Sequence, residues 1–207
     1  MMDAAIFQYG PLFRRAQLEG ILSDCSMVYQ KILSSGMTLN NRENEIRDRL
    51  ADYLEDDSYK MSHTSIVRNF QVDHEIQEGA HGRIDFRFHQ VNPYEGQRVY
   101  FIIECKRLDG SCHLNKEYVE QGINRFKTPG KYSSNLGVNG MMGFLVKPVD
   151  VNVTCRDINT LLAGNECLVP VSLASVNGCY EYESSHPVTS GTVMLLHLWM
   201  DFSSCVK

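Results

Sequence analysis

The chain has 207 residues, of which 43% are hydrophobic and 22% charged, with a formal net charge of −5. This length and composition predict one soluble globular domain with a sizeable core, and the acidic balance argues against a protein that coats nucleic acid by bulk charge. The charge is uneven, since residues 43–78 hold ten acids and four bases, whereas residues 81–132 hold nine bases and six acids. A local basic cleft in the second segment is compatible with this distribution.

No apolar run reaches the roughly 18–20 residues that a membrane span needs. The first residues, MMDAAIFQYGPLFRR, do not combine a charged region with an apolar one, so no signal peptide is expected. The seven cysteines are scattered and form no CxxC pair. An odd number of scattered cysteines is typical of free thiols in a reducing cytosol. We therefore expect a cytoplasmic protein without membrane contact.

Two helices and a strand are predicted before residue 80. Apolar residues recur near helical spacing over residues 11–35, within an N-terminal helical region at residues 1–38. A second helix is expected in NRENEIRDRLADYLEDD, with one apolar stripe and with Asn40 or Asn41 as its cap. Residues 66–77 alternate weakly between apolar and polar, which indicates a strand.

A hairpin of two strands is predicted next. HGRIDFRFHQ, residues 81–90, alternates between apolar and polar side chains, as a half-buried strand does. VYFIIECK, residues 99–106, is nearly continuous in apolar residues, which is typical of a central strand. The turn-forming NPYEGQ lies between them. The two strands are therefore expected to pair in antiparallel fashion.

Helices and strands are expected to alternate in the second half of the chain. DGSCHLN reads as a loop, and NKEYVEQGINRFKT as a helix that ends before Pro129, with Gly122 at a close approach. MMGFLVKPVD predicts a third buried strand, and TCRDINTLLAG a short helix from a Thr154 cap to a Gly164 stop. Residues 150–207 extend the sheet, with a turn at residues 183–186 and a long strand in GTVMLLHLWMDF. The fold class is α/β.

Charged residues end the apolar strand at residues 99–106, where Glu104 and Lys106 stand two positions apart. Residues two apart on a strand share a face. If the hairpin pairs this strand with the strand of Asp85, the three charges converge at one edge of the sheet, with the carbonyl of Cys105 between them. Two carboxylates and a carbonyl are hard oxygen ligands, which suit Mg²⁺ or Mn²⁺ rather than zinc.

Asp85 in GRID, with Glu104 and Lys106 in IIECK, forms the pattern D-x(18)-E-x-K behind an acidic helix. This pattern resembles the PD-(D/E)XK nuclease superfamily, in an uncharacterised bacterial branch, and the likeness covers about residues 41–147, the expected catalytic core. Ile84, rather than Pro, precedes Asp85. The resemblance implies a restriction-endonuclease-like fold, in which a central mixed β-sheet is flanked by helices. It also implies a Mg²⁺-dependent nuclease that accepts Mn²⁺ as a substitute.

The resemblance implies further site residues on the two neighbouring helices. Families of this kind often have a glutamate on the helix before the hairpin that joins the metal site. Glu45 is the first candidate and Glu43 its rival. The helix after the motif often carries a Gln or a basic residue that faces the site. Its candidates are Gln121 and Arg125, followed by Lys116 and Tyr118.

The expected activity is hydrolysis of phosphodiester bonds, in DNA rather than RNA, in a restriction, repair or anti-phage system. The implied metal ligands are Asp85, Glu104, Glu45 and the Cys105 carbonyl. Lys106 would position the attacking water, and Gln121 would orient the lysine or the phosphate. No separate sequence-reading module is visible, so we expect a partner protein that supplies the target, or a homodimer that cuts both strands.

Two other classes of protein remain open. A non-catalytic subunit with the nuclease fold would bind a protein partner or nucleic acid in a larger complex. A cysteine hydrolase ranks third, since no local signature supports a Cys–His pair. The structural alternatives are a solvated salt bridge for Glu104 and Lys106, an ion pair with Arg83 or Arg87 for Asp85, a pair with Arg49 for Glu45, and a solvent-facing position for Gln121.

Some conspicuous residues carry no functional prediction. Cys105, Cys112 and His113 match no common zinc spacing, and no phosphate-binding glycine loop is present. His197 lies in the apolar MLLHLWM, where a satisfied core histidine is expected.

Overall fold

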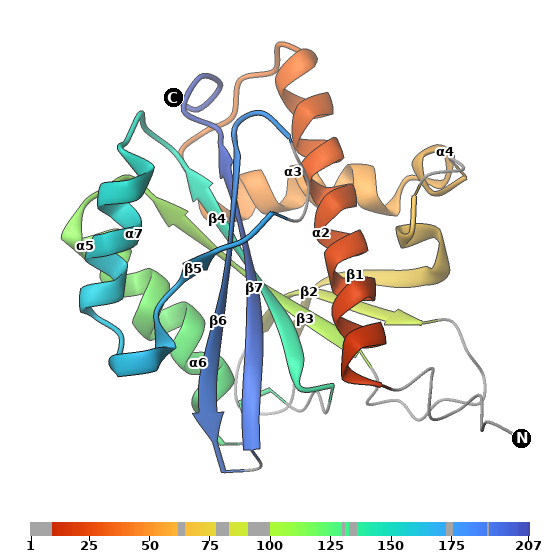
Figure 1. The fold of residues 1–207 in the computed structure, drawn as a ribbon. Helices are drawn as coiled ribbons and strands as arrows, with labels where there is room; N and C mark the ends of the chain where they lie inside the picture. The colour runs from red at the N-terminus through yellow and green to blue at the C-terminus, as the bar shows by residue number, and fades with distance from the viewer. Residues whose placement is uncertain are drawn as a thin grey trace, which may run out of the picture.

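The computed structural model describes residues 10–61, 65–77, 83–90, 100–129, 131–132, 136–172, 176–189 and 191–207. These residues form a seven-stranded mixed β-sheet with helices on both faces (Figure 1). The predicted turn NPYEGQ lies outside the described residues. No helix in the described segments combines the length and the apolar character that crossing a membrane requires.

The strands are arranged in the order β1-β2-β3-β4-β7-β6-β5. Their bounds are β1 Phe70–Gln77, β2 Arg83–Gln90, β3 Tyr100–Leu108, β4 Val138–Leu145, β5 Val169–Pro170, β6 Cys179–Val188 and β7 Gly191–Asp201. β1, β2 and β3 pair in antiparallel fashion, whereas β4 runs parallel to both β3 and β7. β6 pairs antiparallel with β7 and with the short β5. The predicted hairpin of β2 and β3 is confirmed, and β3 lies inside the sheet.

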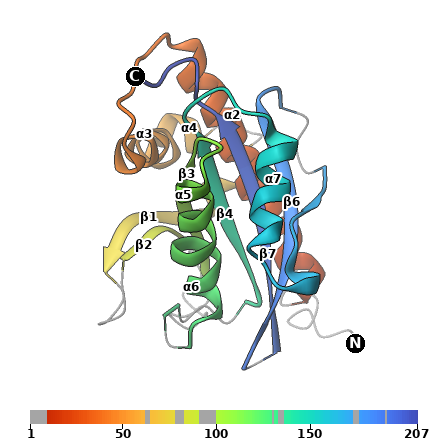
Figure 2. The same cartoon turned by 90° about the vertical axis from the view of Figure 1, so that its left-hand side faces the viewer.

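The helices cover the two faces of the sheet in separate groups. α2 (Pro11–Ser34) and α3 (Glu43–Glu55) pack on one face, and α4 (Asp57–Lys60) follows α3. The other face carries α5 (Cys112–Tyr118), the π-helical turn η2 (Val119–Ile123), α6 (Asn124–Lys127) and α7 (Val151–Thr160). Figure 2 shows this second group in front of the sheet and α2 behind it. Short 3₁₀ turns at Val67–Asn69 and Gly164–Glu166 precede β1 and β5.

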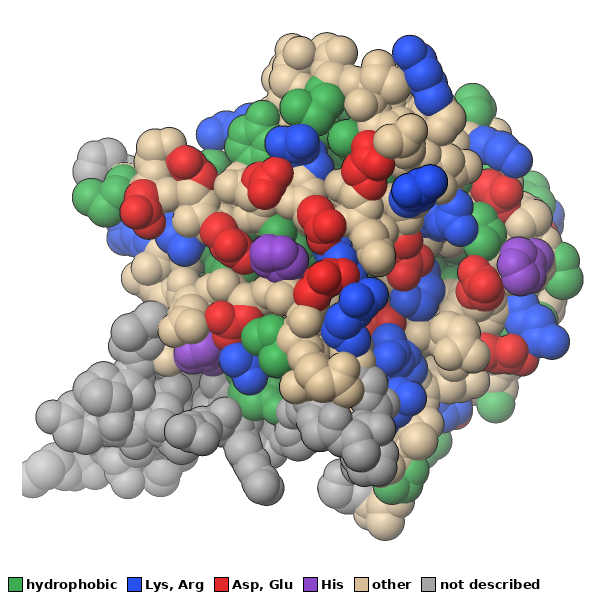
Figure 3. Space-filling view, turned by 180° about the vertical axis from the view of Figure 1, so that it is seen from behind, with side chains coloured by type: hydrophobic (Ala, Val, Ile, Leu, Met, Phe, Trp, Pro, Cys, Tyr) green, Lys and Arg blue, Asp and Glu red, His purple; other side chains and the backbone are tan. Residues whose placement is uncertain are grey.

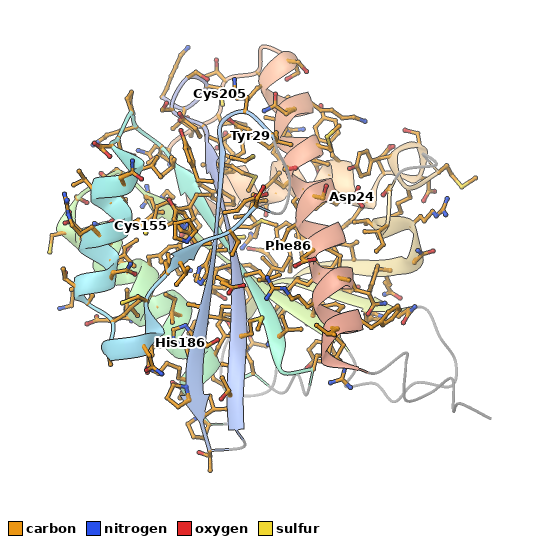
Figure 4. The ribbon with its side chains drawn as sticks, viewed as in Figure 1. Asp24, Tyr29, Phe86, Cys155, His186 and Cys205 are labelled. Atoms are coloured by element: carbon orange, nitrogen blue, oxygen red, sulfur yellow. The ribbon has the colours of Figure 1, made fainter. Side chains whose placement is uncertain are left out.

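Side-chain alternation along β3 separates the two cores. Phe101, Ile103 and Cys105 pack towards α2 and α3, where Phe86 of β2 also lies (Figure 4). Tyr100 and Ile102 pack towards α5, η2 and α6. Glu104 and Lys106 therefore belong to the second face by their spacing, and Cys105 points the opposite way, as the sequence predicts.

Several predicted boundaries are wrong in detail. α3 begins at Glu43 after Arg42, and neither Asn40 nor Asn41 caps it with a side chain. α7 is capped by Asp150, whose carboxylate accepts two backbone N–H groups, and not by Thr154. α5 begins inside the predicted loop, where the hydroxyl of Ser111 caps it. The predicted turn at residues 183–186 lies within β6. All seven cysteines are free thiols, as predicted.

Gly122 marks a close approach between helix and sheet, as predicted. A Cβ atom added at Gly122 would lie 2.6 Å from Cε of Met141 on β4 and 3.4 Å from Cγ of Lys106 on β3. The missing side chain thus lets η2 rest directly on two strands. This contact positions the helical segment that follows, α6, over the end of β3.

The second core contains a chain of polar side chains joined by contacts of 2.7 to 3.0 Å. Its members, in order, are Trp199, Tyr118, His197, Ser184, His186 and Glu166. The indole of Trp199 can only donate a hydrogen bond, and the carboxylate of Glu166 accepts one. If every group between them accepts from the Trp199 side and donates towards Glu166, each imidazole makes one bond of each kind and is neutral. His186 and His197 are fully buried, and His186 is labelled in Figure 4. His197 is therefore a satisfied core histidine.

Burial, followed by the nearby His186, lowers the pKa of His197 from 6.5 to about 3. In the unfolded chain this imidazole takes up a proton below about pH 6.5, whereas in the folded protein it does not. Lowering the pH from 7 to 5 should therefore reduce the free energy of unfolding by about 2 kcal/mol through His197 alone. Urea unfolding at pH 7, 6 and 5 measures this loss.

His197→Gln should remove most of that pH dependence. The matched control is His113→Gln, because the side chain of His113 is 79% exposed. Equal pH dependence in both variants would contradict the assignment.

Candidate active site

Asp85 lies where the pairing of β2 and β3 ends. The register runs from His89↔Tyr100 to Phe86↔Ile103 and stops there. One oxygen of Asp85, Oδ2, accepts the backbone N–H of Cys105 at 2.8 Å. The carboxylate thus takes the place of a ladder partner and inserts between the two strands. Asp85 is 6% exposed.

Glu104 is a fully buried carboxylate with three donors. Lys106 Nζ donates to its Oε1 at 2.8 Å, and Arg125 donates to the same oxygen. The hydroxyl of Tyr132 donates to Oε2. Burial raises the pKa of Glu104 and the negative charge of Asp85 raises it further, while Lys106 and Arg125 act in the opposite direction. The two carboxylates are thus close enough to repel each other, as the predicted convergence requires.

Lys106 connects the peptide of Cys105 to the two glutamates beside it. Its Nζ donates to the Cys105 carbonyl at 2.6 Å, to Glu104 at 2.8 Å and to Oε1 of Glu43 at 3.1 Å. Burial opposes its charge, but the carboxylates outweigh burial and raise the pKa of Lys106 above its ordinary value. Lys106 is therefore protonated, and 8% exposed. A solvated salt bridge does not describe this pair.

The helix acid at this site is Glu43 and not Glu45. Glu43 accepts from Lys106 with Oε1 and from the backbone N–H of Arg107 with Oε2 at 3.2 Å. Glu45 instead accepts from the backbone and side-chain amides of Asn40, at 2.8 and 2.7 Å. These bonds lower the pKa of Glu45 and hold its carboxylate against the chain that enters α3. The expected partner Arg49 pairs with Asp52 instead.

The helical segment after β3 contributes Arg125 and not Gln121. Gln121 is exposed, and its side chain makes no hydrogen bond within the described part of the chain. Lys116 pairs with Glu120 on the surface, and Tyr118 belongs to the buried polar chain. Arg125, one of the predicted alternatives, reaches Glu104. The intervening π-helical turn changes which side chains face the sheet.

Two further residues, Arg47 and Tyr132, contact the carboxylates of the site. Arg47, on α3 and fully buried, donates from its NH1 to Oδ1 of Asp85 at 2.9 Å. Arg47 also pairs with Asp48 and with Glu75, which adopts a left-handed backbone with φ of 53° inside β1. The spacing Glu43–Arg47, four residues on one helix face, is a signal that could have found Arg47. Tyr132 gave no such signal.

The alternative partners proposed for Asp85 are engaged elsewhere. Arg83 pairs with Glu75 at 3.1 Å, and Arg87 pairs with Asp73 at 2.7 Å. The thiol of Cys105 is fully buried on the opposite face, and burial raises its pKa well above the ordinary value. Among the described residues, no hydrogen bond joins a cysteine thiol to a histidine. These contacts give no support to a cysteine nucleophile.

The donors around Cys105 fit a hard divalent cation in kind, since they are carboxylate and carbonyl oxygens. Within the described segments, no three His, Cys, Asp or Glu side chains are grouped closely enough to hold a metal by themselves. A cation would therefore depend on Asp85, Glu104 and the carbonyl of Cys105 together. Each of these groups contacts a cationic side chain of the same chain. Asp85 contacts Arg47, the carbonyl of Cys105 contacts Lys106, and Glu104 contacts Arg125.

No protein-family model, no curated protein and no solved structure matches this chain.

We expect Lys106→Met to raise the pKa of Glu104 further, because the substitution removes a cation that stabilises the charged carboxylate. Carbon-13 NMR of labelled glutamate side chains can follow this titration. Lys127→Met is the matched control, since Lys127 pairs with Glu166 and not with Glu104. A Glu104 titration that is the same in both variants would contradict the described pairing.

Proposed function

We propose that this chain is a metal-dependent nuclease that hydrolyses phosphodiester bonds, in DNA rather than RNA. The observation that carries the proposal is the gathering of Asp85, Glu104 and Lys106 around the peptide of Cys105. The carboxylates and the carbonyl would hold Mg²⁺, with Mn²⁺ as a substitute. When bound, the metal would supply Lewis acidity and a more acidic water.

The chain's own residues have separate tasks in this proposal. Lys106, protonated and bonded to both glutamates, positions the attacking water and offsets charge on the phosphate. Glu43 holds the ammonium of Lys106 in place. Arg125 and Tyr132 fix the orientation of Glu104, and Arg47 fixes that of Asp85. Burial of the site excludes bulk water, which strengthens each of these interactions.

The strand arrangement supports a restriction-endonuclease-like fold. An antiparallel β1-β2-β3 unit is followed by helices and by β4 parallel to β3, and α3 supplies an acid ahead of the hairpin. We place this single domain in the cytoplasm, since its cysteines are free thiols.

The distribution of charge on the surface supports a role for a protein partner or a second copy of the chain. On the described part of the face in Figure 3, acidic and basic side chains lie interspersed and form no broad basic area. A protein partner that supplies the target, or a second copy that cuts the other strand, would compensate for this weak electrostatic attraction. Restriction, repair and anti-phage defence are the systems in which we place the enzyme.

A second candidate is a non-catalytic subunit with the same fold. It is favoured by the pairing of Asp85, Glu104 and the carbonyl of Cys105 with cations of the same chain. Such pairing stabilises the apo arrangement and competes with a metal. Activity measurements separate the two candidates.

Plasmid, linear duplex, single-stranded DNA and RNA should be incubated with Mg²⁺ or Mn²⁺. We expect cleavage by the wild type, and a loss of at least about 100-fold in Asp85→Ala and Glu104→Ala, because metal-assisted charge stabilisation contributes several kcal/mol. Thiol alkylation should have no effect. Cleavage that persists in either variant, or in EDTA, would refute the assignment, and absence of any cleavage would favour the non-catalytic subunit.

Glu43→Gln and Glu45→Gln form a matched pair on one helix. Glu43→Gln weakens the anchor of Lys106, so the cleavage rate should fall about 10- to 100-fold, as with other supporting residues of metal sites. Glu45→Gln touches only the contacts with Asn40 and should change the rate less than about threefold. A larger loss in the Glu45 variant would restore Glu45 as the site acid.

A further inference from the structure

A pocket of about 650 Å³ adjoins the proposed active site. Its lining comes from the segment that enters α3, from α3 itself and from the end of β3. Glu43 is shared by the two places, since Glu43 lines the pocket and also binds Lys106. A substrate strand that reaches Lys106 therefore has the pocket directly beside it.

The pocket contains four carboxylates, and each of them is engaged by donors of the protein. Glu43 accepts from Lys106 and from the backbone of Arg107. The remaining three pairs are Glu45 with Asn40, Asp48 with Arg47, and Asp52 with Arg49. The negative charge of Glu43, Asp48 and Asp52 is thereby partly offset by cations, whereas the amide of Asn40 is neutral and leaves the charge of Glu45 in place.

Arg107 is a pocket cation whose side chain is anchored by uncharged acceptors. Its NH1 donates to the backbone carbonyl of Asn41 at 2.9 Å and to the side-chain oxygen of Asn41 at 2.8 Å. Both acceptors are uncharged, and within the described segments the guanidinium of Arg107 forms no ion pair with a carboxylate. Arg107 is half-buried, so its position is fixed while its positive charge remains available.

We propose that Arg107 binds a backbone phosphate of the nucleic-acid strand, next to the phosphate that is cleaved at Lys106. This inference rests on the proposed function and deepens it. A guanidinium with one nitrogen anchored still offers further N–H donors, and its planar fork matches phosphate oxygens. The fixed orientation lowers the entropy lost on binding. Because contacts with phosphate are independent of the bases, Arg107 fixes the register of the strand and reads no sequence.

The test is binding of short fluorescein-labelled DNA, single-stranded and duplex, followed by fluorescence anisotropy in EDTA across a salt series. Arg107→Ala should weaken binding about tenfold. It should also reduce the slope of log K against log salt by about 0.7 for single strands or 0.9 for duplex. Arg49→Ala is the matched control, since Arg49 lines the same pocket and its loss changes the net charge equally, but Asp52 already engages it.

Arg49→Ala is expected to bind within about twofold of the wild type, and Arg107→Lys should recover only part of the affinity, because lysine lacks the fork. An equal loss of DNA affinity in the two alanine variants would show that only the net charge matters, and it would overturn the proposal. Absence of DNA binding by the wild type would overturn it as well. Thermal melts establish that each variant is folded.

Cleavage assays in parallel keep this proposal separate from the proposed function. Metal-dependent cleavage with unchanged binding by Arg107→Ala would refute the phosphate contact alone. Weakened binding by Arg107→Ala without any cleavage by the wild type would retain the phosphate contact and refute the nuclease.

Discussion

A carboxylate with no exposure to solvent governs the arrangement around Glu104. Removing an ionised carboxylate from water is strongly unfavourable unless charged partners and hydrogen bonds compensate for the lost hydration. Glu104 finds these partners in Lys106 of the same strand, Arg125 of α6 and Tyr132 of the following segment. Three segments therefore converge on one side chain, and the contacts that compensate its burial are also the contacts that form the site.

The helical layer of α5, η2 and α6 is held in register with the sheet by two contacts of different kinds. Gly122 allows η2 to rest on Met141 and Lys106, so this contact depends on the absence of a side chain. Tyr118, one turn earlier, is fixed by directional hydrogen bonds to His197 and from Trp199 of β7. Polar bonds of this kind are costly when incomplete, so a shift of the helix along the sheet is disfavoured. Arg125 reaches Glu104 because both contacts are met.

The strands' part of the site could be predicted because a period of two is local. Once β2 and β3 pair, the spacing fixes that Glu104 and Lys106 share a face. The direction of Asp85 does not follow from this period, because Ile84 packs in one core and Phe86 in the other. The helix acid that contacts Lys106 is Glu43, the rival of the first candidate Glu45. Helical spacing favours Glu43, because Glu43 lies three residues before Ile46, on the buried stripe, and Glu45 does not. The sequence could not show that Arg125 and Tyr132 contact Glu104. The position of Arg125 depends on a π-helical turn, and that of Tyr132 on a contact between residues far apart in the chain.

The same ion pairs bear on both stability and chemistry. Arg47, Lys106 and Arg125 neutralise buried acids, so without a metal the folded protein avoids uncompensated negative charge. Asp85 and the carbonyl of Cys105 would hold a divalent cation only if Lys106 gave up its bond to that carbonyl. The ammonium would then keep Glu104 and Glu43 as its remaining partners. In the proposed enzyme the bond to Glu43 would hold the ammonium at the end of β3, whereas in a non-catalytic subunit the same bond would serve only the buried ion-pair network.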